Sequence, residues 1–175
     1  MSCALTQGYS VADCKGGGLG GAKEVYIIEL ANIASMTATA GVITALSKAT
    51  GKRFWKYQQI KETSYGKETL QANEANGSNY WQHEVGIVLN RMKSSTRAEI
   101  VLLAQNIVAI VVKDNNGSFW LYGKENGLQL SANEGGTGTA MPDRNGYTLT
   151  FTGAEAEPAI EIAAAVAADL ETAGS

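Results

Sequence analysis

The stretch of residues 94–122 constrains the fold most, because signals for a helix, a buried strand and a tight hairpin follow one another in it without a gap. Thr96 and Glu99 have the spacing of a capping box, which predicts a helix that begins near Thr96, within about 94–105. The apolar positions of this helix are Ile100, Val101, Leu102, Leu103 and Ala104. We therefore expect one broad apolar face that packs against a sheet.

The residues after this helix predict two paired strands. Residues 107–112 are apolar and mostly β-branched, which is typical of a strand covered on both faces. The Asp-Asn-Asn-Gly sequence at 114–117 tolerates positive φ, and residues 119–122 resume a strand pattern. The stretch thus predicts a hairpin with a helix lying against its sheet.

The rest of the chain adds further strands and no second long helix. The segments with strand patterns are 25–30, 42–46, 79–91, 127–131 and 147–152. In the last of these, Tyr147, Leu149 and Phe151 alternate with threonines, so we expect these three side chains to point inward. The predicted fold class is α+β and mainly β: an antiparallel β-sandwich or rolled sheet of seven or eight strands, flanked by one helix at about 94–105.

The domain organisation follows from composition. Residues 1–22 are polar and Gly-rich, which predicts a flexible leader before one β-rich domain at 23–162. The leader contains a G-x-G-x-x-G pattern, but a strand pattern follows it where a dinucleotide site requires a helix. The Ala-rich segment 163–175 is either a helix that needs a neighbour or a frayed tail.

Residues 62–78 are polar with few apolar anchors, so they predict an arm or long hairpin that projects from the domain. If the protein assembles, this arm is the expected contact. The candidate interface residues on and beside it are Tyr65, Lys67, Leu70, Asn76 and Tyr80.

The charges argue against a protein that grips duplex nucleic acid, because the net charge is −3. Residues 1–93 carry ten basic and seven acidic side chains, whereas residues 94–175 carry four and ten. This asymmetry suits head-to-tail packing of like subunits, and two solvated faces with no such role fit it equally. Basic and aromatic residues interleave over 48–67, which indicates either a site for single-stranded nucleic acid or a half-buried strand solvated by lysines.

Neither catalysis nor a cofactor is indicated. His83 is the single histidine and falls on the apolar side of its strand, which favours a structural role over a general base. The acids Glu155 and Glu157, weighed as a hydrolase pair, fall in an expected polar turn. Cys3 and Cys14 with one histidine are too few for a metal site, and no run is long enough to cross a bilayer. We therefore predict no enzyme activity, no cofactor, no metal and no membrane partner.

Three segments carry a resemblance to a known family. They are SSTRAEIVLLAQNIVAIVVKDNNGSFWLYG at 94–123, GLQLSANEGGTGTAMPDRNGYTLTFTG at 127–153 and CKGGGLGGAKEVYIIEL at 14–30. In layout the chain resembles the tail-tube proteins of tailed bacteriophages and their neck or terminator ring relatives.

The resemblance implies a virion protein made in the bacterial host cytoplasm. It implies subunits that pair side by side, commonly six around a lumen for DNA, in contact with other tail or neck proteins. The segment 62–78 would then be the long hairpin that reaches a neighbour. A modestly acidic protein would let DNA slide through the lumen, because each cation bound to phosphate adds affinity that translocation must break.

A second interpretation is a sugar- or surface-binding β-module. Its platform aromatics would be Trp55, Tyr57, Trp120 and Tyr122, of which the last two lie on one side of their strand.

Overall fold

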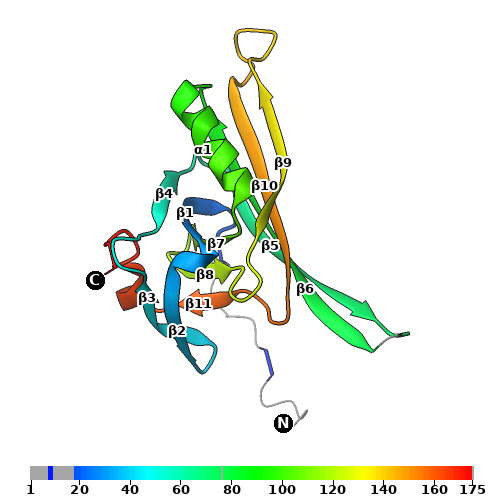
Figure 1. Cartoon of the computed structure of the whole chain (residues 1–175). Helices are drawn as coiled ribbons and strands as arrows, with labels where there is room; N and C mark the ends of the chain where they lie inside the picture. Colours follow the sequence, from blue (N-terminus) through cyan, green and yellow to red (C-terminus); the bar gives the residue numbers. More distant parts are fainter. Residues whose placement is uncertain (1–7, 10–17, 76, 175) are drawn as a thin grey trace.

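The protein is described by a computed structural model that covers residues 8–9, 18–75 and 77–174 and contains two β-sheets and one long helix (Figure 1). In chain order the elements are β1 (Ala22–Glu29), the 3₁₀ helix η1 (Leu30–Asn32), β2 (Ile33–Thr39), β3 (Val42–Lys48), β4 (Trp55–Gln58), β5 (Tyr65–Asn73), β6 (Ser78–Asn90), α1 (Ser94–Gln105), β7 (Val108–Asp114), β8 (Phe119–Tyr122), β9 (Gln129–Gly136), β10 (Gly146–Glu155), β11 (Ile160–Ile162) and α2 (Ala164–Ala167). The predicted class, α+β and mainly β, is confirmed.

One sheet has seven strands in the order β2-β3-β11-β8-β7-β1-β4, and the other has four in the order β5-β6-β10-β9. All neighbouring strands are antiparallel except β11 and β3. The described residues thus form eleven strands, more than the seven or eight expected, because β2 and β11 lie in segments that show no clear alternation.

The core lies on both faces of the seven-stranded sheet. Strand β7 is buried over Val108–Val112, which confirms the strand predicted to be covered on both sides. Its residues alternate between two clusters. Val108, Ile110 and Val112 face the four-stranded sheet, and Ala109 and Val111 face Tyr26, Ile43 and Leu121 on the other side.

The four-stranded sheet uses one face for the core. Strand β10 directs Tyr147, Leu149 and Phe151 inward, as predicted, and they meet Val85 and Ile87 of β6. We call this the inner face, and the opposite face, with Thr148, Thr150 and Thr152, the outer face. In Figure 1, α1 lies over one end of the inner face, and the β5–β6 hairpin runs out beyond the other end.

Helix α1 has the predicted bounds but a different start and a narrower buried face. It begins at Ser94, and within the described chain its N-cap residue Lys93 makes no side-chain capping hydrogen bond, so the predicted capping box of Thr96 and Glu99 is wrong. Its buried residues are Ile100 and Leu103. The other apolar positions, Val101, Leu102 and Ala104, are exposed. The broad packed face predicted from their spacing is therefore wrong, because α1 presents only one edge to the sheet.

The hairpin predicted at residues 114–117 is present and holds part of the leader. The Asp114 carboxylate accepts hydrogen bonds from the backbone N–H groups of Asn116 and Ser118, at 2.8 and 2.9 Å. The Leu19 backbone N–H donates to Asn116 Oδ1 at 2.7 Å, and the Asn115 amide donates to the Gly20 carbonyl at 2.6 Å. Residues 18–21 are thus tied to the turn, contrary to the expected flexible leader, while residues 1–7 and 10–17 lie outside the described part.

The Ala-rich segment is docked, so the frayed-tail interpretation is wrong for its described residues. It forms one helical turn, α2, and then folds back so that Leu170 is 1% exposed. The Lys48 ammonium donates to the Asp169 carbonyl, and the Phe54 N–H donates to the Leu170 carbonyl at 3.0 Å. Large side chains are few in this segment, so Leu170 supplies much of its burial.

We expect Leu170→Ala to lower the free energy of unfolding by about 2–4 kcal/mol. The change opens a cavity among the buried side chains on the side of the seven-stranded sheet that faces away from the four-stranded sheet. The matched control is Leu102→Ala on the exposed face of α1, where Leu102 is 53% exposed and the expected change is within about 0.5 kcal/mol. Urea unfolding followed by circular dichroism measures both variants. Equal midpoints for the two variants would contradict the assigned docking.

Candidate functional site

The candidate site is the β5–β6 hairpin, the predicted arm, together with the sheet that carries it. Nine register pairs join its strands, from Tyr65 opposite Gly86 to Asn73 opposite Ser78. Burial falls steadily toward the tip, where all described residues from Gln71 to Tyr80 are exposed. The arm predicted at 62–78 is therefore a β-hairpin that continues the four-stranded sheet beyond its core (Figure 1).

The structure separates the predicted interface residues onto two faces. Tyr65, Lys67 and Tyr80 share the outer face, because strand alternation and register place them there. Leu70 is on the inner face, directly opposite Trp81. Asn76 lies outside the described residues. Tyr65, Leu70 and Tyr80 are between 42% and 51% exposed.

The base of the arm is closed by an aromatic ring over a glycine. The Tyr65 ring lies against Gly86 so closely that a Cβ on that glycine would overlap it. The Tyr65 hydroxyl donates to Glu84 Oε1 at 2.6 Å, and this hydrogen bond raises the pKa of Tyr65. Lys67 pairs in register with Glu84, so the charges of the outer face are balanced at this point.

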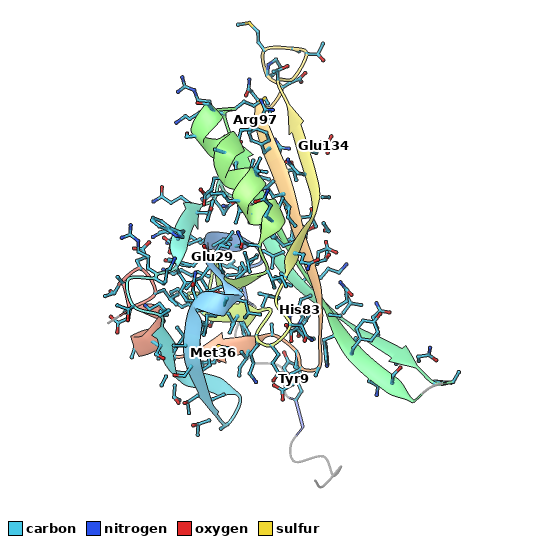
Figure 2. The ribbon with its side chains drawn as sticks, in the orientation of Figure 1. Tyr9, Glu29, Met36, His83, Arg97 and Glu134 are labelled. Atoms are coloured by element: carbon cyan, nitrogen blue, oxygen red, sulfur yellow. The ribbon has the colours of Figure 1, made fainter. Side chains whose placement is uncertain are left out.

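His83 marks the point where the inner face of the arm enters the core (Figure 2). Its side chain is 1% exposed, its Nδ1 accepts a hydrogen bond from the Gly123 N–H at 3.3 Å, and its ring meets Tyr122 edge-on at 5.4 Å. Among the described residues Nε2 has no hydrogen-bond partner. His83 therefore links the two sheets as a buried, neutral imidazole, in keeping with the predicted structural role, although only one of its two ring nitrogens is hydrogen-bonded among the described residues.

Glu155 and Glu157 do not form an acid pair. Glu155 is buried at the end of β10, where its carboxylate accepts hydrogen bonds from the N–H groups of Glu125, Asn126 and Gly127 at 2.9–3.3 Å. Glu157 is exposed and pairs with Lys124 at 2.9 Å. The expectation that both lie in a polar turn is wrong for Glu155, which instead fixes the loop between β8 and β9.

The aromatics weighed as a sugar platform do not gather on an exposed surface. Tyr122 is 8% exposed inside the core, and Trp120 packs against the same cluster. Trp55 is 52% exposed and lies under the guanidinium of Arg53, 4.3 Å from its ring centre. The sequence of β8 does not show which of its side chains face the core between the two sheets, because both faces of that strand are apolar.

The basic stretch 48–67 is divided among separate contacts. Lys48 holds the C-terminal segment, and Lys56 pairs with Glu24 at 2.9 Å. Glu24 also bonds to Tyr26 and Lys113. Although burial of the Glu24 carboxyl opposes the shift, these bonds lower its pKa to about 2. Within the part of the chain that is described, no group of three or more metal-ligating side chains is present, and no helix is long and apolar enough to span a membrane.

Two grooves flank α1, and sequence reasoning missed both. One, of about 730 Å³, lies between the first turns of α1 and strands β9 and β10. The other, of about 470 Å³, lies between α1 and residues of β4 and β6. The signal for the first groove was present in Val101, whose spacing was assigned to the core.

Comparison of the chain with protein-family models, with curated proteins and with solved structures found no match in any of the three.

We expect acid to weaken the fold through His83. Burial lowers its pKa, against opposing effects of the Glu155 and Glu68 carboxylates and the Glu157 backbone. The unfolded chain therefore takes up a proton at His83 near pH 6.5, whereas the folded protein takes it up only at lower pH. The contribution of His83 to the free energy of unfolding is therefore fully present above about pH 6.5 and decreases as the pH falls below it. The limiting slope for one proton is about 1.4 kcal/mol per pH unit.

Urea unfolding between pH 7.5 and 5 measures this slope in the wild type and in His83→Asn, whose amide oxygen can accept from Gly123. The variant should be less stable at pH 7.5 and should lack the extra slope below pH 6.5. Because the chain has a single histidine, parallel curves for the two proteins would refute the assignment.

Proposed function

We propose that this protein is a structural subunit that assembles, through the open edges of its four-stranded sheet, into rings or a tube of a phage tail or neck. The assembly would form a conduit for DNA in the virion. The observation that carries the proposal is the pair of long edge strands, β5 with nine residues and β9 with eight, on opposite sides of one sheet.

These edges have the features of strands that accept a neighbour. Within the described chain, β5 and β9 each pair with a strand along one edge only, so the other edge of each is open. Monomeric proteins blunt such edges with proline, bulges or inward charges. The two prolines, Pro142 and Pro158, both lie outside the strands. Strand β5 carries one inward charge, Glu68, whose carboxylate accepts a hydrogen bond from the Ala159 N–H at 2.6 Å, and β9 has one bulge against β10, between Leu130 and Ala132.

Strand direction favours closure into a ring. The order β5-β6-β10-β9 is antiparallel throughout, so β5 and β9 run in opposite directions. When β9 of one copy meets β5 of the next, the new pair is antiparallel and the alternation continues without interruption. Repetition of this heterologous contact forms a ring when the rotation between copies closes, and the four-stranded sheets of such a ring have no free edge. The resemblance to tail-tube proteins supplies the expectation of six copies.

The outer face has the chemistry that a DNA conduit needs. Strand β10 presents Thr148, Thr150 and Thr152 on it, Lys67 and Glu84 oppose each other in register, and Glu134 of β9 lies opposite Thr148. A face of hydroxyls on which acids outnumber the single lysine gives few cation–phosphate contacts, so DNA would pass without strong binding. The core-bearing inner face, with α1 and the seven-stranded sheet, would form the wall of the ring.

The first measurement is native mass by light scattering over a wide concentration range, followed by cysteine cross-linking of the edges. In a background with Cys3→Ser and Cys14→Ser, we expect Thr69→Cys/Ala132→Cys to give a ladder of covalent oligomers under oxidation. Both positions are on the outer face of the edge strands. Within one copy Thr69 lies at the level of Gln82 and Ala132 at the level of Gly86, so this pair tests a contact in which the neighbour is shifted four residues along the strands. A second pair, Gln71→Cys/Ala132→Cys, tests a register shifted by two residues.

The single variant Thr69→Cys is the control, since dimers formed by it alone would indicate β5 paired with β5 and not a head-to-tail ring. A monodisperse monomer at all concentrations, with or without other virion proteins, and no ladder from either pair would overturn the proposal.

A further inference from the structure

The groove between α1 and strands β9 and β10 combines exposed apolar side chains with positive charge. Met92 is 38% exposed and Val101 is 50% exposed beside it. Lys93 and Arg97 are the charged residues among those that line it, and the first turn of α1 has no acidic residue to offset the positive end of the helix dipole. In Figure 2 Arg97 lies near one end of the molecule, His83 lies near the middle, and the arm extends away from Arg97 beyond His83. The groove therefore suits an apolar segment that carries carboxylates.

The inner face of the arm has the complementary chemistry. Leu70 and Trp81 face each other across β5 and β6 at the level where β10 ends, and Leu70 is 51% exposed. Glu68 lies beside them on the same face, where one carboxylate oxygen accepts a hydrogen bond from the Ala159 N–H at 2.6 Å, and Glu74 lies at the tip. Lys67 points to the opposite face. We call Glu68, Leu70, Glu74 and Trp81 the arm patch.

The groove and the arm patch lie near opposite ends of strand β6. Strand alternation puts Leu70 and Trp81 on the same face as Val85 and Ile87, which is the face that α1 covers. The groove begins just past the end of β6, and the arm patch lies near its start, so one strand of 13 residues, about 43 Å at 3.3 Å per residue, joins them. A second copy in the same orientation, displaced along this strand and sideways across the sheet from β5 and β6 toward β10 and β9, would bring its arm patch to the groove.

We infer that the arm patch of one copy docks into the groove between α1 and strands β9 and β10 of a second copy, stacking subunits end to end. Leu70 and Trp81 pack against Met92 and Val101, while Glu68 and Glu74 lie near Lys93 and Arg97. The contact is heterologous and does not close, so it extends the assembly along the strands while the sheet edges close it sideways. This inference rests on the proposed function, because it supplies the axial contact between the proposed rings.

Two variants of the full-length chain each remove one surface. The groove variant is Lys93→Glu/Arg97→Glu, which places acids at the start of α1, where the helix dipole favours them. The arm variant is Leu70→Asp, with Leu70→Ser as a milder version. The matched controls are Lys52→Glu/Lys61→Glu, with the same charge change elsewhere, and Gln82→Asp, on the outer face of β6 and away from the sheet edge. Urea unfolding verifies that each variant folds.

Native mass and negative-stain electron microscopy give the readout. We expect wild type and both controls to form stacks with an axial repeat of no more than about 43 Å, and the groove and arm variants to form single rings with stacking weakened at least about tenfold. An equimolar mixture of the two variants should give pairs of rings and no longer stacks, because the intact arm of the groove variant fits the intact groove of the arm variant.

Each other outcome decides against the inference. Stacking of the groove and arm variants like wild type, or equal loss in the controls, overturns this contact and leaves the rings of the proposed function standing. Wild-type rings that never stack do the same. A wild type that stays monomeric overturns both the inference and the proposed function.

Discussion

The four-stranded sheet is longer than the layers that cover it, and this difference in length shapes the rest of the molecule. Strand β6 has 13 residues, of which Val85 and Ile87 are buried on the inner face, against the core between the two sheets. Its first residues have a partner in β5 only, so they form an arm with two solvated faces. An isolated hairpin is marginally stable in water, so the arm depends on the covered half of the sheet for its order.

The covered half is secured by polar groups that the core fully encloses. His83 accepts from Gly123 and meets Tyr122, which brings the arm sheet against β8 of the other sheet. Glu155 gathers three backbone N–H groups of the loop that leads from β8 into β9. These contacts tie β6 and β10 to the same loop. They therefore set the direction in which the arm leaves the body.

Close contacts between glycine and tyrosine let the layers approach. Gly66 lies under the Tyr122 ring, and Gly135 lies under the Tyr147 ring, in each case closer than a Cβ would permit. In the first pair the ring comes from the other sheet, so this glycine sets the separation of the two sheets at the base of the arm. Replacement of either glycine would push a buried tyrosine out of the core cluster.

The sequence by itself determined the secondary structure wherever the period was clear. Local patterns predicted the helix at 94–105, the buried strand before the turn at 114–117 and the side chains of β10 that point inward. Tertiary packing did not override these patterns. The polar arm was also predictable, because a long stretch with few apolar anchors cannot pack a core. Short strands such as β11 were not predictable, because three residues carry too little periodicity.

Only the tertiary structure decided which apolar residues are covered. Val101 and Leu102 fit a buried stripe by spacing, but they are exposed because α1 meets the sheet along one edge. Trp120 and Tyr122 alternate as a surface platform would, but they face the core because a second sheet lies on that side. Periodicity defines the faces of an element, whereas the elements that pack against each face come from distant parts of the chain, so the open edges, the grooves and the burial of Glu155 emerge only when those parts meet.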